Sequence, residues 1–562
     1  MKCIIIIIRF NHPTGIYDPK IEKGDYNYNV PVGLAYISAF LKQSGHKIHF
    51  LNLNHRDGIV DELIKDTLSK NRYDFVITGG ISPFYPDVKG YVDSVRRHAP
   101  TTQIILGGGL ISSQPEIMFD LLRPDYGIIG EGELTIKELF ECLENKGDIN
   151  TVKGLIFRNS EGNIIITKPR DPIHNLDLLP WPDYEGLGFD DYLDHMLPTS
   201  SNYHSIFDYP RVYPIIASRS CPFACTFCFH PLGKKYRKRS VENIISELDY
   251  AIKKYKINII MFYDELLAND RVWVNNFCTR LAEFLKTIPW EVKWACQMRV
   301  DILDEEMMII MKNAGCYFFS LGLESYSTTV LKSMNKVITP KQIDNVLHLC
   351  TQHNMAVTGN FIFGDTAETT QTYQETLNYW KENDKIIRNA VALFPITLYQ
   401  GSPLYKLALE KGIIKDEIAF IEKRAAKGDF PINFTDKMSD NEFEKMQQDI
   451  TEAYVLWRRG SVPLLNKKIN GTQEVHIKCP YCNNISVYRN IILPPKFSNW
   501  TVFLICRECH ARIIIDSKSH RTLNLIYRII GFKNTHTIKR YVFPSLLFGI
   551  RNSKKLINKF IN

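Results

Sequence analysis

Residues 218–228 read Ser-Arg-Ser-Cys-Pro-Phe-Ala-Cys-Thr-Phe-Cys, and the rest of the chain is best understood outward from their three cysteines. Cys221, Cys225 and Cys228 follow a C-x3-C-x2-C spacing. Three thiolates can hold three irons of a cubane iron–sulfur cluster, which leaves the fourth iron open to bind and reduce a small molecule. A ferredoxin would add a fourth cysteine, and a zinc site would use four ligands. The spacing therefore favours an open cubane, with a zinc knuckle or an ordinary loop of three thiols as the alternatives.

The length and composition of the chain predict several domains and a reducing compartment. At 562 residues, of which 45% are apolar, the chain can form about three or four domains with sizeable cores. It contains no apolar run of the roughly 18 residues that a membrane span needs. The apolar run at Ile4–Ile8 lacks a small-residue cleavage site, so it predicts a buried strand rather than a signal peptide. Seven of the 13 cysteines fall in two ligand-type clusters, which indicates metal binding in the cytoplasm rather than disulfides.

Residues 1–150 alternate apolar runs with helical patterns, which predicts a doubly wound, flavodoxin-like parallel α/β sheet. Ligands of such sheets bind at the carboxyl ends of the strands, and glycines there let a backbone approach a flat ligand closely. Tight turns of an ordinary sheet are the alternative reading. The expected strands are Ile4–Ile8, Lys47–Leu51, Phe75–Thr78 and Ile104–Leu106, and the expected helices are Val32–Gln43 and Asp61–Ser69. The candidate binding residues are Gly79, Gly80, Gly107, Gly108, Gly109, Gly130, Glu131 and Gly132.

Residues 151–205 predict a connector, and strand–helix alternation resumes over residues 206–440. Six expected strands there fit a partial (β/α)6 barrel of the TIM type, whose functional residues lie at the carboxyl ends of the strands. Singly, the polar residues at these ends can also be strand caps or surface ion pairs. The strands are expected at Pro214–Ala217, Asn258–Tyr263, Lys293–Gln297, Tyr317–Leu323, Val357–Phe363 and Ala390–Pro395. The polar candidates are Asp264, Glu265, Arg299, Glu324, Ser325, Gly364 and Glu368.

The C-terminal part predicts a helical extension over residues 441–474 and a small metal-binding domain over residues 475–515. Cys479 and Cys482 form one C-x2-C knuckle, and Cys506 and Cys509 form a second. Two such knuckles with strand-like sequence between them are typical of a zinc ribbon. An auxiliary iron–sulfur cluster or a rubredoxin-type iron is the alternative.

Residues 516–562 form a basic tail, which holds ten Lys and Arg and no Asp or Glu from Ser517 onward. We expect a basic helix that packs on the body of the protein. A peripheral contact with an anionic membrane surface and a contact with RNA phosphates are the two other readings.

The three cysteines, with the aromatic Phe227 before the last of them, resemble the signature of the radical S-adenosylmethionine (SAM) family. In that family the open iron of a [4Fe-4S] cluster binds SAM, and one electron from a donor such as ferredoxin or flavodoxin cleaves SAM to a 5′-deoxyadenosyl radical. The resemblance implies that Phe227 lies beside the cluster. It also implies contacts of Asp264 and Glu265 with the SAM amine, of Arg299 with its carboxylate, of Glu324 and Ser325 with its ribose, and of Gly364 and Glu368 with its adenine.

The glycine groups, preceded by Pro31-x-Gly33-Leu34-Ala35-Tyr36, resemble the cobalamin-binding domain that precedes many radical SAM enzymes. The family's D-x-H-x-x-G motif for a lower cobalt ligand is absent. His12 and His55 keep only its H-x-x-G part, and a histidine without an orienting carboxylate is a poor ligand. Whether a histidine binds the cobalt therefore stays open.

Together these resemblances imply a cobalamin-dependent radical SAM enzyme that transfers a methyl group to an unactivated carbon or to phosphorus. Methylcobalamin would deliver the methyl group, and a second SAM would restore it. The alternatives are a cyclase or rearrangement enzyme that transfers no methyl group, a tRNA-modifying enzyme, and a non-enzymatic corrinoid or electron carrier. The acceptor, a small molecule or a peptide, has no diagnostic motif.

Overall fold

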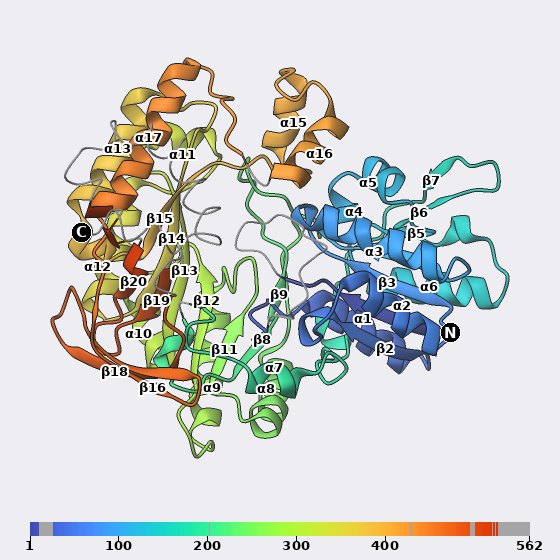
Figure 1. Cartoon of the computed structure of the whole chain (residues 1–562), viewed down its shortest axis with the longest axis horizontal. Helices are drawn as coiled ribbons and strands as arrows, with labels where there is room; N and C mark the ends of the chain where they lie inside the picture. The colour runs from blue at the N-terminus through green and yellow to red at the C-terminus, as the bar shows by residue number, and fades with distance from the viewer. Residues whose placement is uncertain are drawn as a thin grey trace, which may run out of the picture.

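The computed structural model describes residues 1–10, 26–201, 203–427, 430–494, 501–519, 521–522 and 524–525. Over these residues, two large and mainly parallel sheets lie side by side, and two small antiparallel sheets follow toward the C-terminus (Figure 1). No helix in the described ranges is long and apolar enough to cross a membrane. His12 and most of the basic tail fall outside the described residues, so the membrane and RNA contacts assigned to the tail stay predictions.

The first sheet has the strand order β2-β1-β3-β4-β5-β6-β7. Its first five strands pair in parallel, and their order is that of flavodoxin-like sheets, which confirms the predicted doubly wound fold. The hairpin β6–β7 pairs antiparallel on β5, so the sheet runs past residue 150, the predicted end of the domain. The strands are β1 (Lys2–Ile7), β2 (Lys47–Asn52), β3 (Phe75–Gly79), β4 (Gln103–Gly107), β5 (Tyr126–Ile128), β6 (Leu155–Arg158) and β7 (Ile164–Ile166).

Both faces of this sheet are covered, because side chains alternate along its central strands. On β1, Cys3, Ile5 and Ile7 pack into one core with the apolar residues of α1 (Val32–Gln43) and α6 (Glu133–Glu144). Ile4 and Ile6 pack into a second core with α2 (Val60–Lys70) and α3 (Tyr85–His98). A strand buried on both faces reads as a continuous apolar run, which explains the isoleucine run near the N-terminus.

The second sheet is the predicted partial barrel, with strand order β15-β14-β13-β12-β11-β8. Every neighbouring pair is parallel. The strands are β8 (Val212–Ile215), β11 (Ile259–Phe262), β12 (Lys293–Met298), β13 (Cys316–Glu324), β14 (Ala356–Phe363) and β15 (Val391–Pro395). The helices between them are α8 (Val241–Tyr255), α9 (Arg271–Leu285), α10 (Glu305–Asn313), α11 (Thr328–Ser333), α12 (Pro340–Gln352), α13 (Thr370–Glu382) and α14 (Asp384–Ile387).

Beyond β15 the chain returns toward the first sheet and then back to the barrel (Figure 1). Helices α15 (Pro403–Glu410) and α16 (Glu417–Lys427) make the return. Glu422 on α16 accepts hydrogen bonds from Tyr85 Oη at 2.7 Å and Lys89 Nζ at 3.0 Å, both on α3. Helix α17 (Asp440–Leu456) then packs against α13 and β15.

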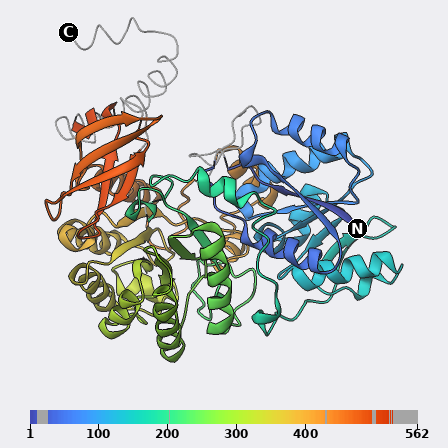
Figure 2. The same cartoon turned by 90° about the horizontal axis from the view of Figure 1, so that it is seen from below.

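The C-terminal sheets lie on the barrel, on the side away from the first sheet (Figure 2). Arg388 Nη1 donates to the carbonyl of Cys509 at 2.8 Å, and His510 pairs with the carbonyl of Asn354. Asn354 and Arg388 directly precede β14 and β15, so the contact is at the amino ends of the barrel strands. The sheets consist of β16 (Pro463–Ile469), β17 (Thr472–Lys478), β18 (Ile485–Ile491), β19 (Thr501–Ile505) and β20 (Arg512–Asp516).

Asp87, in the first turn of α3, gives the fold a pH dependence. Burial raises the pKa of its carboxyl from 3.8 to about 7. The folded chain therefore holds this proton more tightly than the unfolded chain, so stability falls as pH rises from about 4 to about 7 and the full cost remains above pH 7. We expect Asp87→Asn to raise the free energy of unfolding at pH 8 by an amount on the order of 1–3 kcal/mol. The thermal midpoint at pH 8 should rise accordingly. The same substitution should have little effect at pH 4, and equal shifts at both pH values would contradict this assignment.

Candidate functional site: two adjoining cavities at the junction of the sheets

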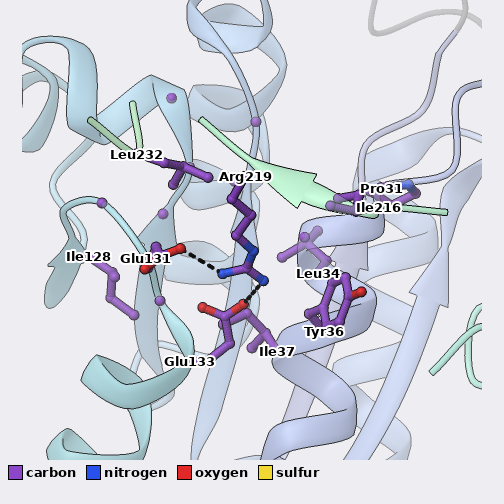
Figure 3. Close-up of a pocket in the computed structure, with 18 of the residues that line it drawn as sticks. Pro31, Leu34, Tyr36, Ile37, Ile128, Glu131, Glu133, Ile216, Arg219 and Leu232 are labelled. Carbon is purple, nitrogen blue, oxygen red and sulfur yellow. Dashed lines mark hydrogen bonds and ion pairs between the residues drawn. The ribbon is translucent and has the colours of Figure 1, made fainter. Parts of the chain in front are cut away.

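A first cavity of about 420 Å³ lies between the carboxyl ends of the first sheet's strands and the barrel (Figure 3). The predicted glycines of the loops after β3, β4 and β5 line one wall, together with Glu131. The barrel supplies the opposite wall through the segment that precedes Cys221 and through the end of β11. The lining residues from the first sheet are Gly79, Gly80, Gly107, Gly108, Gly109, Gly130, Glu131 and Gly132, and those from the barrel include Ile216, Ser218, Arg219, Ser220, Tyr263, Asp264 and Glu265.

The glycine wall has no room for side chains at two of its positions. A Cβ atom on Gly79 would lie 2.3 Å from the carbonyl oxygen of Gly107. Gly108 has φ of +78° and would place a Cβ atom 2.8 Å from the carbonyl oxygen of Gly80. The loops after β3 and β4 can approach each other only because these residues are glycines. With Leu34, Ile37 and Ile128 also in the lining, the wall suits a broad, flat, largely apolar ligand, and it therefore fits a corrin ring.

His55 lies away from this cavity. Its Nε2 atom is 2.9 Å from Tyr28 Oη, and its Nδ1 atom is 3.5 Å from a carboxylate oxygen of Asp191. Burial lowers the pKa of His55 to about 4. A hydrogen-bonded histidine outside the lining is poorly placed to reach a bound corrin. The candidate cobalt ligand His55 is therefore better described as a packing residue of the first sheet.

A second cavity of about 260 Å³ contains all three cysteines of the 218–228 stretch. The hydrogen bond from the Cys228 thiol lowers the pKa of Cys225, whereas burial raises the pKa of Cys221. Three sulfur donors from one short loop, facing one enclosed space, fit the donor set of a cubane cluster with one open iron. The lining residues are Cys221, Phe223, Cys225, Cys228, His230, Glu265, Gln297, Met298, Arg299, Ser320, Leu321, Gly322, Glu324, Lys336 and Asn360.

Charged side chains surround the cysteines in the second cavity. Glu324, in the left-handed backbone region at φ of +62°, accepts a hydrogen bond from Lys336 Nζ at 2.9 Å. The guanidinium of Arg299 lies 3.5 Å from the ring centroid of Phe223 and pairs with Asp301 at 2.9 Å. Arg299 and Glu324 thus line the same cavity as the three cysteines, and their contacts with SAM remain proposals.

Two ionisable residues that line the second cavity were not predicted from the sequence. Lys336 is buried, and only the fold brings it to Glu324. His230 follows Cys228 by two residues, and both of its ring nitrogens are buried without a hydrogen-bond partner. Its Nδ1 atom is 3.4 Å from a carboxylate oxygen of Glu265. Proximity to the cysteines was the available signal for His230, whereas no local pattern marks Lys336.

The predicted amine ligands Asp264 and Glu265 have different surroundings. Asp264 lines only the first of the two cavities. Its carboxylate accepts hydrogen bonds from the Ala217 N–H at 3.1 Å and from Ser218 Oγ at 2.5 Å, and burial raises its pKa to about 7. Asp264 therefore braces the segment that leads into the cysteines. Glu265 lines both cavities, so the two cavities adjoin at this residue.

Four other predicted residues lie outside the linings of these two cavities. Ser325 Oγ lies 3.1 Å from Thr376 Oγ1. Glu368 accepts hydrogen bonds from Thr372 Oγ1 at 2.5 Å and from the Gly364 N–H at 3.2 Å. Phe227 packs against a separate apolar cluster that includes Val330 and Met334. Phe227, Ser325, Gly364 and Glu368 therefore do not line either cavity, and their contacts with a cofactor remain proposals.

The four C-terminal cysteines form a compact site of their own. The sulfurs of Cys479, Cys482, Cys506 and Cys509 all lie within 4.8 Å of one another. Two of the separations, Cys479–Cys509 and Cys482–Cys506, are 3.7 Å. Zinc–sulfur bonds of about 2.3 Å in a tetrahedron place sulfurs about 3.8 Å apart. The site therefore fits a structural zinc ion, and iron in the same geometry remains the alternative.

We expect Cys482→Ala to release the metal of this site and to lower the thermal midpoint by about 5–10 °C, since structural zinc sites contribute several kcal/mol of folding free energy. Because the ribbon packs at the amino ends of the barrel strands, the cofactor cavities should be unaffected. Metal analysis of the variant should show that zinc is lost, while the content of iron bound by the cysteines of residues 218–228 is unchanged. Loss of that iron as well would contradict a purely structural role.

Comparison with known proteins identifies both parts of this junction. The profile of the radical SAM superfamily matches residues 215–379, and that of the B12 binding domain matches residues 26–140. The chain contains a radical SAM domain and a B12-binding domain. The radical SAM domain implies a [4Fe-4S] cluster and SAM, and the B12-binding domain implies cobalamin. The three cysteines of the second cavity fit the cluster, and the glycine wall of the first cavity fits cobalamin.

Several known proteins are similar to this chain. An uncharacterized methyltransferase of Pyrococcus horikoshii is 28% identical over 393 residues, which cover 68% of this chain and 79% of the relative. An anaerobic magnesium-protoporphyrin IX monomethyl ester cyclase of Rubrivivax gelatinosus is 25% identical, over 62% of this chain and 61% of the cyclase. The structure of TsrM, a radical SAM methyltransferase of Kitasatospora setae with cobalamin and a [4Fe-4S] cluster bound, superposes with a TM-score of 0.57 at 15% identity, covering 74% of this chain and 75% of that one.

Proposed function

We propose that this radical SAM enzyme is a cobalamin-dependent methyltransferase that methylates an unactivated carbon or a phosphorus centre. The observation that carries the proposal is the shared wall at Glu265: the glycine-walled cavity and the cysteine cavity adjoin. A methyl donor in the first cavity and a radical source in the second would then both reach an acceptor placed between them.

The residues of the chain would bind and orient the cofactors and enclose the space between them. Cys221, Cys225 and Cys228 would hold the cluster, and Glu324 with Arg299 would hold SAM at the open iron. The glycine wall would hold cobalamin with its face toward the barrel. When bound, these cofactors supply a transferable methyl group and a substrate-activating radical, and the protein supplies position and exclusion of water.

The relatives support methyl transfer more than cyclisation. The Pyrococcus horikoshii relative is named a methyltransferase and is matched over a larger share of its length than the cyclase is. The TsrM structure, whose fold this chain shares, is that of a methyltransferase with both cofactors. A cyclisation or rearrangement without methyl transfer is the second candidate, and the Rubrivivax gelatinosus relative is the observation that favours it.

The two candidates differ in the fate of SAM. We expect the anaerobically reconstituted protein, given SAM labelled in its methyl group, a low-potential donor such as ferredoxin or flavodoxin, and a small-molecule or peptide acceptor fraction, to release S-adenosylhomocysteine and to label an acceptor. A cyclase would release 5′-deoxyadenosine without S-adenosylhomocysteine and without a labelled acceptor. That second result would contradict methyl transfer.

A further inference from the structure

A cluster of four buried charged side chains joins the two walls of the first cavity, and Figure 3 shows three of them, Arg219, Glu131 and Glu133. Arg219 Nη1 donates to Glu131 Oε1 at 2.9 Å, and Arg219 Nη2 donates to Glu133 Oε1 at 2.5 Å. Arg237 Nη1 donates to both carboxylate oxygens of Glu131, at 2.8 and 2.9 Å. Glu131 lies in the loop after β5 and Glu133 begins α6, whereas Arg219 and Arg237 lie on a small two-stranded sheet next to the cysteine loop. We call these four residues the ion-pair cluster.

All four side chains of the ion-pair cluster are buried. The exposed fractions of its side chains are 8% for Arg219, 4% for Arg237, 3% for Glu131 and 6% for Glu133. Burial alone would raise the pKa of Glu131, yet Arg219, the Ile173 N–H and Arg237 together leave it below its ordinary value. Two positive and two negative charges balance. Burying four charges costs desolvation energy that a well-packed apolar contact would avoid, so such clusters are weak evidence for stability alone.

The arginines of the cluster hold the segment that carries Cys221. Arg219 precedes Cys221 by two residues and lies on β9 (Ser218–Arg219), which pairs antiparallel with β10 (Arg237–Lys238). Between Arg219 and Cys221, Ser220 has φ of +72°. Arg237 Nη2 donates to Ser220 Oγ at 3.1 Å, which fixes this unusual backbone. Any shift of Arg219 or Arg237 would therefore move the first cysteine.

The glutamates of the cluster belong to the glycine wall. Glu131 and Glu133 flank Gly132, and all three line the first cavity. Glu131 Oε2 also accepts a hydrogen bond from the Ile173 N–H at 2.6 Å, and Arg219 lies 5.3 Å from the ring centroid of Tyr36. The carboxylate of Glu131 is thus committed to the barrel and is not available to a ligand of the cavity, which changes the role assigned to it from sequence.

We propose that the ion-pair cluster is a positioning device that sets the distance and angle between the glycine wall and the three-cysteine loop, with Arg219 as its central positioning residue. The planar guanidinium bridges two carboxylates that flank Gly132, so it fixes orientation as well as separation. The inference rests on the proposed function, in which the groups held by these two walls act on one acceptor.

A second ion pair, between the first domain and the segment that returns from the barrel, provides a control. Lys89 and Glu422 also join the first sheet's α3 to the returning segment, at 3.0 Å. Their side chains are 41% and 45% exposed, and neither lines either cavity. If the ion-pair cluster served only to hold the domains together, loss of the Lys89–Glu422 pair would change the same measurements as loss of the cluster.

The test uses three variants of the reconstituted full chain. Arg219→Lys keeps the charge but cannot bridge two carboxylates in one plane. Arg219→Met combined with Glu133→Gln removes one charge of each sign, so the Arg237–Glu131 pair stays balanced. Glu422→Gln is the control. The first readout is the relaxation of the cob(II)alamin electron paramagnetic resonance signal caused by the reduced cluster, which depends on their separation and needs no acceptor.

We expect both Arg219 variants to keep iron and cobalamin and to cleave SAM, while the relaxation becomes slower and heterogeneous. With an acceptor, the yield of labelled product per 5′-deoxyadenosine should fall about 10- to 100-fold, the usual cost of a misplacement near 1 Å. Glu422→Gln should match the wild type in both readouts. Unchanged relaxation in the Arg219→Lys or the double variant would overturn the inference, as would an equal change in Glu422→Gln. Because relaxation is measured without turnover, a failure of the proposed methyl transfer would leave this test intact.

Discussion

Cys225→Ala is expected to reduce SAM cleavage to background and to remove about four irons per chain, because a cubane with only two thiolate ligands is not retained. Cys225 lies in the second cavity with Cys221 and Cys228, and the hydrogen bond from Cys228 favours its thiolate. The first cavity does not contain this residue. Cobalamin content should therefore remain at the wild-type level. The measurements are iron content and 5′-deoxyadenosine yield under reducing, oxygen-free conditions.

The control for this variant is Cys142→Ala, which removes a partly buried thiol of α6 that lines neither cavity. It should cleave SAM like the wild type. If Cys225→Ala kept its cluster and its cleavage activity, the assignment of the three cysteines as a cluster site would be wrong.

Gly107→Leu is expected to produce the opposite pattern, with cobalamin lost and the cluster retained. Among the described residues, and apart from its neighbours in the chain, a Cβ built on Gly107 would have one atom within 4 Å, the Cβ of Ile128 at 3.8 Å. The backbone can therefore accept a side chain, but a leucine would extend into the space of the first cavity. Steric overlap between the leucine and the corrin should cost about 3 kcal/mol or more. Each 1.4 kcal/mol weakens binding about tenfold, so the affinity for cobalamin should fall at least about 100-fold. Titration by visible absorption measures this affinity.

Gly107→Ala is the matched control, because its single methyl group makes an ordinary contact with Ile128. It should bind cobalamin within a small factor of the wild type. Tight binding of cobalamin by Gly107→Leu, with the first sheet intact, would show that the corrin ring lies elsewhere. Taken together, Cys225→Ala and Gly107→Leu separate the two cofactors on one chain.

The parts of the site that sequence alone predicted are those encoded locally. The spacing of Cys221, Cys225 and Cys228 is itself the chemistry of a cluster site, and the alternation of apolar runs with helical patterns specifies parallel sheets. The strand β5 was not predicted, because its three residues, Tyr126–Ile128, are too few to show a period. The glycines at positions 79 and 107 were found because a strand end followed by glycine is a local signal.

The side-chain roles that sequence alone missed depend on partners far along the chain. Glu131 and Asp264 are acidic residues at strand ends, where a ligand contact is a fair expectation. Their actual partners, Arg219 for Glu131 and the Ala217–Ser218 backbone for Asp264, lie 88 and 46–47 residues away. Only the packing of the two sheets determines these pairings. No local pattern distinguishes a carboxylate that binds a cofactor from one that binds another part of the protein.

The central claim is that one chain holds a cobalamin beside a cluster with an open iron, and elemental analysis of the anaerobically reconstituted protein tests it most directly. The account predicts one cobalt and about four irons per chain, with one zinc for the four-cysteine site. Iron without cobalt, or cobalt without the cluster iron, would contradict the claim that the two adjoining cavities of this chain bind their cofactors together.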